Sequence, residues 1–105
     1  MKLDDFKRGD SFALYAELEW DGEPLIIDAS ALRSQIRTKN NKFISELSIS
    51  KDVTQGENVF VLEASDTNNW PVASLFMDIE IDDGGVITSS ATIEIPVIRD
   101  VTRDD

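Results

Sequence analysis

Strict alternation of apolar and polar side chains is the feature that most constrains the fold of this chain. It runs through Ser11–Trp20 and again through Val72–Asp82. Successive side chains of a β-strand point to opposite faces, so this spacing predicts strands that each place one face in a hydrophobic core. The predicted inward residues are Phe12, Leu14, Ala16, Leu18 and Trp20 in the first stretch and Ala73, Leu75, Met77, Ile79 and Ile81 in the second.

Turn sequences divide the rest of the chain into short segments of similar character. Asp21-Gly22 and Asp83-Gly84-Gly85 are typical of tight hairpins, because glycine accepts a positive φ without steric cost. No helix is predicted. Further strands are predicted at Ala31–Thr38, Phe43–Ser50, Asn58–Ala64 and Val86–Val97, with exposed sheet edges at the short run Leu25–Ile27 and at the Pro96 end of the last strand.

Evenly spaced strands with hairpin turns predict an all-β fold, an antiparallel β-sandwich of about seven strands. The length of 105 residues suits one domain over residues 1–105, with flexible tails near 1–5 and 101–105. The predicted core comprises Phe12, Leu14, Leu18, Leu32, Ile36, Leu62, Leu75, Met77, Ile79, Ile93 and Ile95.

The composition narrows the chemistry that the domain can carry out. The chain has no cysteine and no histidine, so it lacks the thiolate and imidazole groups of most nucleophilic and zinc-dependent catalysis. We therefore expect no enzymatic activity, no cofactor and no metal site. A net charge of −11 repels phosphate backbones and anionic lipid, which excludes nucleic acid and membrane surfaces as expected partners. The N-terminus lacks the apolar segment of a signal peptide, so we expect synthesis in the cytoplasm.

Three aromatic residues are candidates for binding a partner. Trp70 lies in the polar segment Asp66–Pro71, where it either contacts a partner or sugar or folds back to close one end of the core. Tyr15 and Phe76 occupy the outward faces of their predicted strands. With Val59 and Val61 they form either an apolar interface stripe or ordinary surface.

Two further motifs have a simpler explanation than a functional one. Arg8-Gly9-Asp10 matches a tripeptide that cell-surface receptors bind, but the same residues make a turn before the first long strand. Carboxylate pairs occur at Asp4/Asp5, Asp82/Asp83 and Asp104/Asp105, where they could serve a glycosidase or a hard cation. Their positions at the ends of the chain and at a hairpin favour solvated tails and turns.

Three segments taken together resemble a known family. They are Phe6–Phe12, Leu32–Arg37 and the C-terminal third, in which Asp66-Thr67 and Trp70 precede Phe76–Ile79, a glycine turn and Pro96–Arg103. This arrangement is similar to small immunoglobulin-like domains of tailed-phage and prophage structural modules, such as the N-terminal domain of baseplate upper proteins and short accessory tail proteins. Residues Asp21–Ala29 depart from the family pattern, because Leu25–Asp28 stands where a Leu-Thr-Gly turn is usual.

The resemblance implies an immunoglobulin-like β-sandwich that acts as a structural protein of a phage tail or baseplate. Its implied partners are other phage structural proteins or copies of itself, and its implied location is the virion. The alternative function is a carbohydrate- or receptor-binding module, with Trp70 and nearby carboxylates as the sugar platform.

Overall fold

The computed structural model describes residues 1–90 and 92–99, and nearly all of its regular structure is β-strand. The all-β prediction is confirmed, although several predicted strands are divided into shorter ones. A single turn of 3-10 helix, η1 (Ala29–Ala31), is a small departure from the expectation of no helix. The strands are β1 (Phe6–Lys7), β2 (Phe12–Glu17), β3 (Glu19–Trp20), β4 (Glu23–Pro24), β5 (Leu32–Thr38), β6 (Phe43–Glu46), β7 (Ser48–Lys51), β8 (Val59–Ala64), β9 (Ser74–Asp83), β10 (Val86–Ser89) and β11 (Ile93–Ile98).

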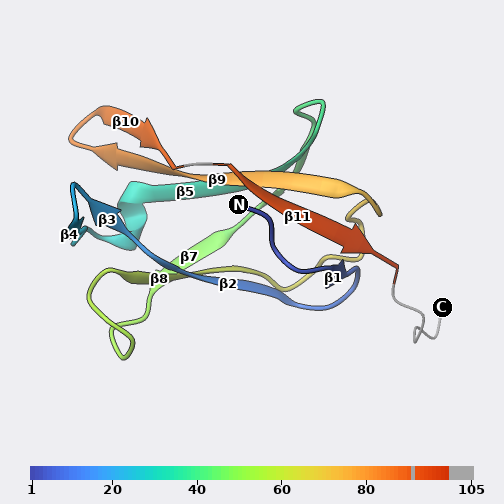
Figure 1. Ribbon diagram of the computed structural model, residues 1–105, viewed down its shortest axis with the longest axis horizontal. Helices are drawn as coiled ribbons and strands as arrows, with labels where there is room; N and C mark the ends of the chain where they lie inside the picture. The colour runs from blue at the N-terminus through green and yellow to red at the C-terminus, as the bar shows by residue number, and fades with distance from the viewer. Residues whose placement is uncertain (91, 100–105) are drawn as a thin grey trace.

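The strands form two facing sheets and a small projecting hairpin (Figure 1). The large sheet has the order β1-β11-β9-β5-β6, with β10 also paired to β9, and the small sheet has the order β2-β8-β7. The chain crosses from the large to the small sheet at Leu47, which is buried and donates its amide to the Ser34 carbonyl oxygen at 2.9 Å. Strand β1 runs parallel to β11, so the large sheet is mixed and the prediction of a purely antiparallel fold is wrong at this pairing.

The core lies between the inward faces of the two sheets, as the alternation predicted. The large sheet contributes Ile36, Leu75, Met77, Ile79, Ile81, Ile95 and Val97, and the small sheet contributes Phe12, Phe60 and Leu62. Three predicted core residues, Leu14, Leu18 and Ile93, are only partly buried.

The predicted strand Ser11–Trp20 is broken at Leu18, which lies between β2 and β3. The break rotates the chain, and Trp20 is 52% exposed instead of facing the core. The Asp21-Gly22 turn is confirmed: both residues have positive φ, 55° and 79°, and they join β3 to β4. The predicted edge run Leu25–Ile27 forms no strand. The exposed pairing in this region is made by β3 and β4.

The predicted strand Val86–Val97 is divided into β10 and β11, which pair with different halves of β9. Between them, the Ser90 amide donates to the Ile79 carbonyl at 2.9 Å and the Ile79 amide donates to the Ser90 hydroxyl, also at 2.9 Å. The hydroxyl oxygen of Ser90 thus accepts the hydrogen bond that a backbone carbonyl would accept in an uninterrupted pair of strands. Pro96 is not at a sheet edge, because β11 pairs with β9 on one side and β1 on the other.

The N-terminal residues are attached to the sheet instead of forming a tail. The Leu3 amide donates to the Glu94 carbonyl at 2.9 Å, and the Glu94 amide donates to the Met1 carbonyl at 2.8 Å. The backbone N–H that Pro96 lacks would point to this same side, two residues beyond Glu94. That missing donor accounts for the gap in pairing before β1. The other predicted tail, residues 101–105, lies outside the described residues.

Candidate protein-binding surfaces

The three predicted binding residues lie in three different places. Trp70 is 2% exposed and packs with Phe6 and Phe12, all three ring centroids lying 5.4–5.5 Å apart. It therefore closes one end of the core, and a role as an exposed partner contact or sugar platform is wrong. Tyr15 is 61% exposed on the outer face of the small sheet, whereas Phe76 lies half-buried on the outer face of the large sheet.

The predicted apolar stripe does not form, because Tyr15 and Phe76 face opposite sides of the sandwich. Tyr15 lies directly across from Val61 in the β2–β8 pairing, so these two are neighbours. Val59 is buried against the loop that precedes it, where its Cγ2 lies near Gly56. The small sheet thus offers only a minor apolar patch around Tyr15.

The outer face of the large sheet carries a more organised set of side chains, in rows across β6, β5 and β9. One row places Arg37 between Phe43 on β6 and Phe76 on β9. The irregularity in the β5–β6 register after Ile36 is what turns Phe43 to this face. The Arg37 guanidinium lies 5.7 Å from the centre of the Phe43 ring, within the range of a cation–π interaction.

Hydrogen bonds fix the polar side chains of this face in position. Arg37 donates to the Gln35 side-chain oxygen at 2.7 Å and to the Asn41 carbonyl at 3.0 Å. Gln35 in turn donates to Glu46 at 2.8 Å, and Arg33 forms an ion pair with the same carboxylate at 3.1 Å. The hydrogen bond from Gln35, followed by that from Arg33, lowers the pKa of the Glu46 carboxyl. The row is therefore preorganised and carries its positive charge toward the tip of the β5–β6 hairpin.

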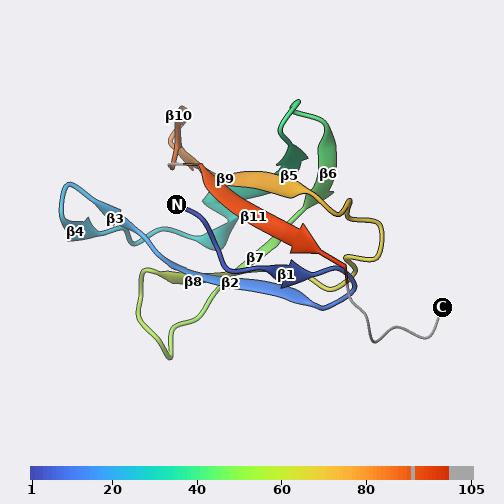
Figure 2. The ribbon, with the colours of Figure 1, turned by 45° about the vertical axis from the view of Figure 1, so that its right-hand side comes forward.

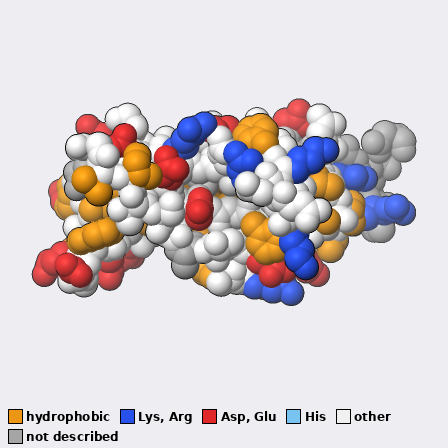
Figure 3. Space-filling model, turned by 90° about the horizontal axis from the view of Figure 1, so that it is seen from above, with side chains coloured by type: hydrophobic (Ala, Val, Ile, Leu, Met, Phe, Trp, Pro, Cys, Tyr) orange, Lys and Arg blue, Asp and Glu red, His pale blue; other side chains and the backbone are white. Residues whose placement is uncertain are grey.

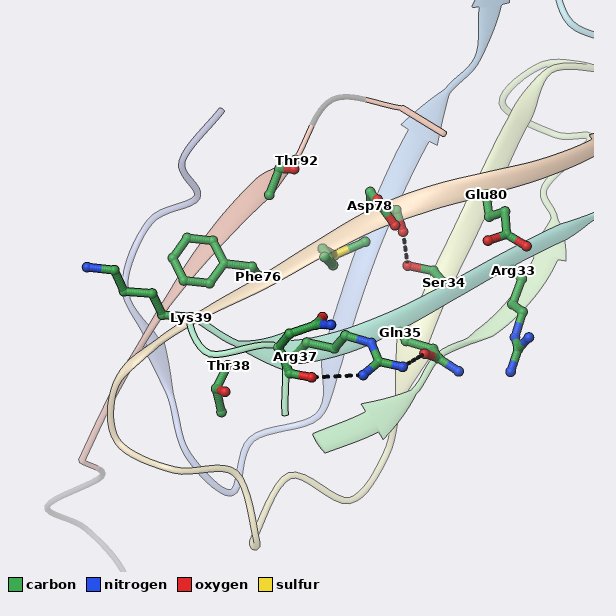
Figure 4. Close-up of a pocket in the computed structure, with 12 residues that line it drawn as sticks. Arg33, Ser34, Gln35, Arg37, Thr38, Lys39, Phe76, Asp78, Glu80 and Thr92 are labelled. Atoms are coloured by element: carbon green, nitrogen blue, oxygen red, sulfur yellow. Dashed lines mark hydrogen bonds between the residues drawn. The ribbon is translucent and has the colours of Figure 1, made fainter. Parts of the chain in front are cut away.

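Of these side chains, Arg33, Gln35, Arg37 and Phe76 line a trough of about 630 Å³. The β5–β6 and β9–β10 hairpins both rise on this side of the large sheet (Figure 2). The close-up shows Lys39 and Phe76 at one end of the trough and Arg33 and Glu80 toward the other (Figure 4). Beneath it, Ser34 donates to the Asp78 carbonyl at 2.6 Å and holds β5 to β9. The lining residues are Arg33, Ser34, Gln35, Arg37, Thr38, Lys39, Asn41, Phe76, Met77, Asp78, Glu80 and Thr92.

The trough is lined by three cations, Arg33, Arg37 and Lys39, and by two carboxylates, Asp78 and Glu80, so it carries a small positive charge in a strongly acidic chain. Residues 33–42 include Arg33, Arg37, Lys39 and Lys42 and no acidic residue, in a chain whose net charge is −11. Viewed onto this face, the lysine and arginine side chains lie mostly in the right-hand part of the molecule (Figure 3). Residues 39–42 connect the predicted strands Ala31–Thr38 and Phe43–Ser50, and the sequence analysis assigned this connection no function. The four lysine and arginine residues of segment 33–42, with no aspartate or glutamate among them, were the sequence signal that could have identified this part of the site.

Open strand edges are a second means of contacting a partner. Among the described strands, β2 and β7 each pair with β8 alone, and β6 pairs with β5 alone. Each therefore has one side whose backbone groups are available to an added strand. These edges replace the two predicted ones, at Leu25–Ile27 and Pro96.

The remaining sequence motifs have structural roles. Gly9 adopts a φ of 100°, and its amide donates to the Thr67 hydroxyl at 2.8 Å, which confirms a turn at Arg8-Gly9-Asp10. The Asp82 carboxylate accepts the Gly85 amide at 3.0 Å and so supports the β9–β10 turn. Within residues 1–90 and 92–99 no three potential metal-ligating side chains cluster. No helix in this described part of the chain is long and apolar enough to cross a membrane. Asp104 and Asp105 lie outside the described residues.

A comparison of the sequence with models of protein families found no match, and a search of curated proteins found no relative.

Proposed function

We propose that this domain is a non-catalytic assembly module that binds a protein partner across the outer face of its large sheet. The observation that carries the proposal is the preorganised row Phe43–Arg37–Phe76, of which Arg37 and Phe76 line the trough. Arginine and aromatic side chains are enriched at the centres of protein interfaces, and rigid placement lowers the entropy lost on binding. The open edges of β2, β6 and β7 offer additional contacts through strand addition.

We further propose that the sandwich is of the immunoglobulin-like type. In that topology the second, fifth and fourth strands form one sheet, and the last, sixth and third strands form the centre of the other. The order β2-β8-β7 matches the first of these sheets, and β11-β9-β5-β6 matches the second with one additional edge strand. Strand β1 departs from this scheme, because it pairs in parallel with the last strand, β11, whereas the first strand of a constant-type domain lies in the sheet of the second strand.

The assembly that we propose is a phage or prophage tail or baseplate, with the protein synthesised in the cytoplasm and incorporated into the virion. This part of the proposal rests on the sequence resemblance. Two of the segments that carry the resemblance meet in space: Phe6 packs on Trp70, and the Gly9 amide donates to Thr67. Their contact supports treating the segments as one structural unit and not as unrelated short matches.

The chemistry of the trough also favours binding over catalysis. Its lining combines cationic, amide, hydroxyl and carboxylate side chains with one aromatic ring. Histidine and cysteine are absent from the whole sequence. The side chains that line the trough are therefore suited to recognising the charge and shape of a partner.

A matched pair of lysine variants tests the proposed binding face. Lys39 lines the trough, while Lys42 belongs to the same hairpin and does not line it. The protein would be mixed with the products of its neighbouring genes, and complex formation would be measured by native mass spectrometry and by titration. We expect Lys39→Ser and Phe76→Ser each to weaken the complex about tenfold or more, and Lys42→Ser to leave it within about twofold.

Two results would refute this function. One is a complex whose affinity is the same for the wild type and for both trough variants, because the partner would then lie elsewhere. The other is failure to bind any neighbouring gene product together with clear binding on a glycan array, which would establish the carbohydrate-binding alternative.

A further inference from the structure

Charge is segregated along this chain as well as across its surface. Residues 17–28 contain Glu17, Glu19, Asp21, Glu23 and Asp28 and no lysine or arginine, in contrast to the basic residues 33–42. The acidic segment includes the β3–β4 hairpin, which projects from one end of the sandwich, and the tip of the basic β5–β6 hairpin lies in the opposite half (Figure 1). In the space-filling view, the left-hand end shows acidic and hydrophobic side chains, and the basic ones lie mostly to the right (Figure 3).

The β3–β4 hairpin presents an aromatic side chain between carboxylates. Trp20 is 52% exposed, and Glu19, Asp21 and Glu23 beside it are exposed as well. Leaving half of a tryptophan side chain in contact with water is unfavourable in free energy. Tryptophan is also among the residues that contribute most to the binding energy of protein interfaces.

The hairpin is held firmly enough to act as a binding element. The positive φ angles of Asp21 and Gly22 match a tight two-residue turn. At its base, the Leu25 amide donates to the Leu18 carbonyl oxygen at 2.9 Å. Trp20 and its acidic neighbours are thus displayed in a defined arrangement.

We propose that the β3–β4 hairpin of one copy of this protein docks into the trough of a second copy. Trp20 would pack against Phe76 and the Arg37 guanidinium, and the hairpin carboxylates would face Arg37 and Lys39, at the end of the trough away from Glu80 and from the Arg33–Glu46 ion pair (Figure 4). Aromatic rings bind guanidinium groups face to face, and opposite charges fix the register of an interface. This inference rests on the proposed function, since it names the occupant of the same binding face.

The geometry of such a contact determines the kind of assembly. The hairpin and the trough are different surfaces, so the contact is heterologous and each bound copy leaves one hairpin and one trough unused. Copies then add head to tail into a ring or an open chain. The net charge of −11 opposes association at long range, but at physiological ionic strength charges are screened beyond about 8 Å, which leaves the local pairs dominant.

Two complementary variants test the inference. The trough variant carries Arg37→Ser and Lys39→Ser, and the hairpin variant carries Trp20→Ser and Glu23→Gln. Weight-average mass would be measured by sedimentation equilibrium as a function of concentration, at an ionic strength of about 0.15 M. Circular dichroism would confirm that each variant is folded.

We expect the mass of the wild type to rise with concentration and each variant alone to remain monomeric. An equimolar mixture of the two variants should form a heterodimer and grow no further, because each partner supplies one intact surface. Lys42→Ser and Ile26→Ser alter an exposed cation and an exposed apolar residue outside the contact, and they should behave as the wild type does.

The inference is overturned if the wild type stays monomeric up to millimolar concentration, if either variant alone associates as the wild type does, or if the mixture stays monomeric. These results are separable from failure of the proposed function. Suppose that the wild type is monomeric but Lys39→Ser no longer binds the neighbouring gene product. The proposed function is then supported, and the occupant of the binding face is a segment of another protein. If both experiments fail, both proposals are wrong.

Discussion

Leu18 and Asn58 are joined by two hydrogen bonds that run in opposite directions. The Leu18 amide donates to the Asn58 carbonyl at 3.0 Å, and the Asn58 side-chain amide donates to the Leu18 carbonyl at 2.8 Å. Asn58 is only 8% exposed, and it fills the gap where β2 ends and β3 begins. This pair therefore determines where the chain leaves the small sheet and where the hairpin that carries Trp20 starts to project.

Replacing Asn58 with aspartate should destabilise the fold by about 2 kcal/mol or more at neutral pH. The substitution puts a carboxylate oxygen where a donor now faces the Leu18 carbonyl, and a buried charge without a donor is costly. Urea unfolding gives the free energy. Asn69→Asp makes the same chemical change at an exposed loop position and should stay within about 0.5 kcal/mol of the wild type. Equal effects from the two substitutions would contradict the role assigned to Asn58.

The Thr67 hydroxyl connects two distant loops and offers a second test. It accepts the Gly9 amide at 2.8 Å and donates to the Asp10 carbonyl at 2.7 Å, and Thr67 is fully buried. Thr67→Val keeps the shape of the side chain but leaves both backbone groups without this partner, at a cost of about 2 kcal/mol or more. Thr67→Ser retains the hydroxyl and should cost less than the valine variant. The reverse ranking in urea unfolding would show that packing, and not hydrogen bonding, gives Thr67 its importance.

The sequence predicted the sheets better than it predicted the ends of the strands. The alternation in Val72–Asp82 identified the buried side of β9, including Leu75, Met77 and Ile79. It could not locate the break at Leu18, because that break depends on Asn58, which is remote in sequence. Trp20 followed the alternation and was placed inside, although it is exposed.

Long-range contacts also explain why the candidate site was only partly predicted. Phe76 was correctly assigned to an outward face by its position in β9. Its neighbours could not be identified, because the row with Arg37 and Phe43 depends on the pairing of three strands and on an irregular register. Trp70 lies in a polar segment, and its burial depends on Phe6 and Phe12, from the opposite end of the chain.

The two tryptophans should respond oppositely to substitution. Trp70→Ala removes a buried ring from the aromatic cluster and should cost about 3–5 kcal/mol in the free energy of unfolding. Trp20→Ala removes a ring that is half exposed and should cost about 0.5 kcal/mol or less in dilute, monomeric protein. Acrylamide, an uncharged quencher that the acidic hairpin does not repel, should quench the fluorescence of Trp20 and leave that of Trp70 largely unaffected. Comparable losses of stability for the two variants would contradict the packing described for them.

The Glu46 carboxyl provides a test based on pH. Its lowered pKa arises first from the hydrogen bond with Gln35 and then from Arg33, and Gln35→Met removes the larger cause. We therefore expect the pKa of Glu46 to rise toward the ordinary glutamate value of about 4.3 in that variant, as measured by carboxyl-carbon chemical shifts in an NMR titration. Gln55→Met, the same change at an exposed position on a distant loop, should leave the Glu46 pKa as in the wild type.

The sign of the accompanying stability change follows from the direction of the pKa shift. A carboxyl whose pKa is lower in the folded state binds protons more weakly there than in the unfolded chain, so it stabilises the fold when ionised. That contribution is complete above the ordinary glutamate pKa and is lost as the pH falls through the lowered value. Wild type and Glu46→Gln should therefore differ most near neutral pH and converge in acid. A difference that is constant from neutral pH down to about pH 2 would show that the Gln35–Glu46 hydrogen bond does not favour the charged form.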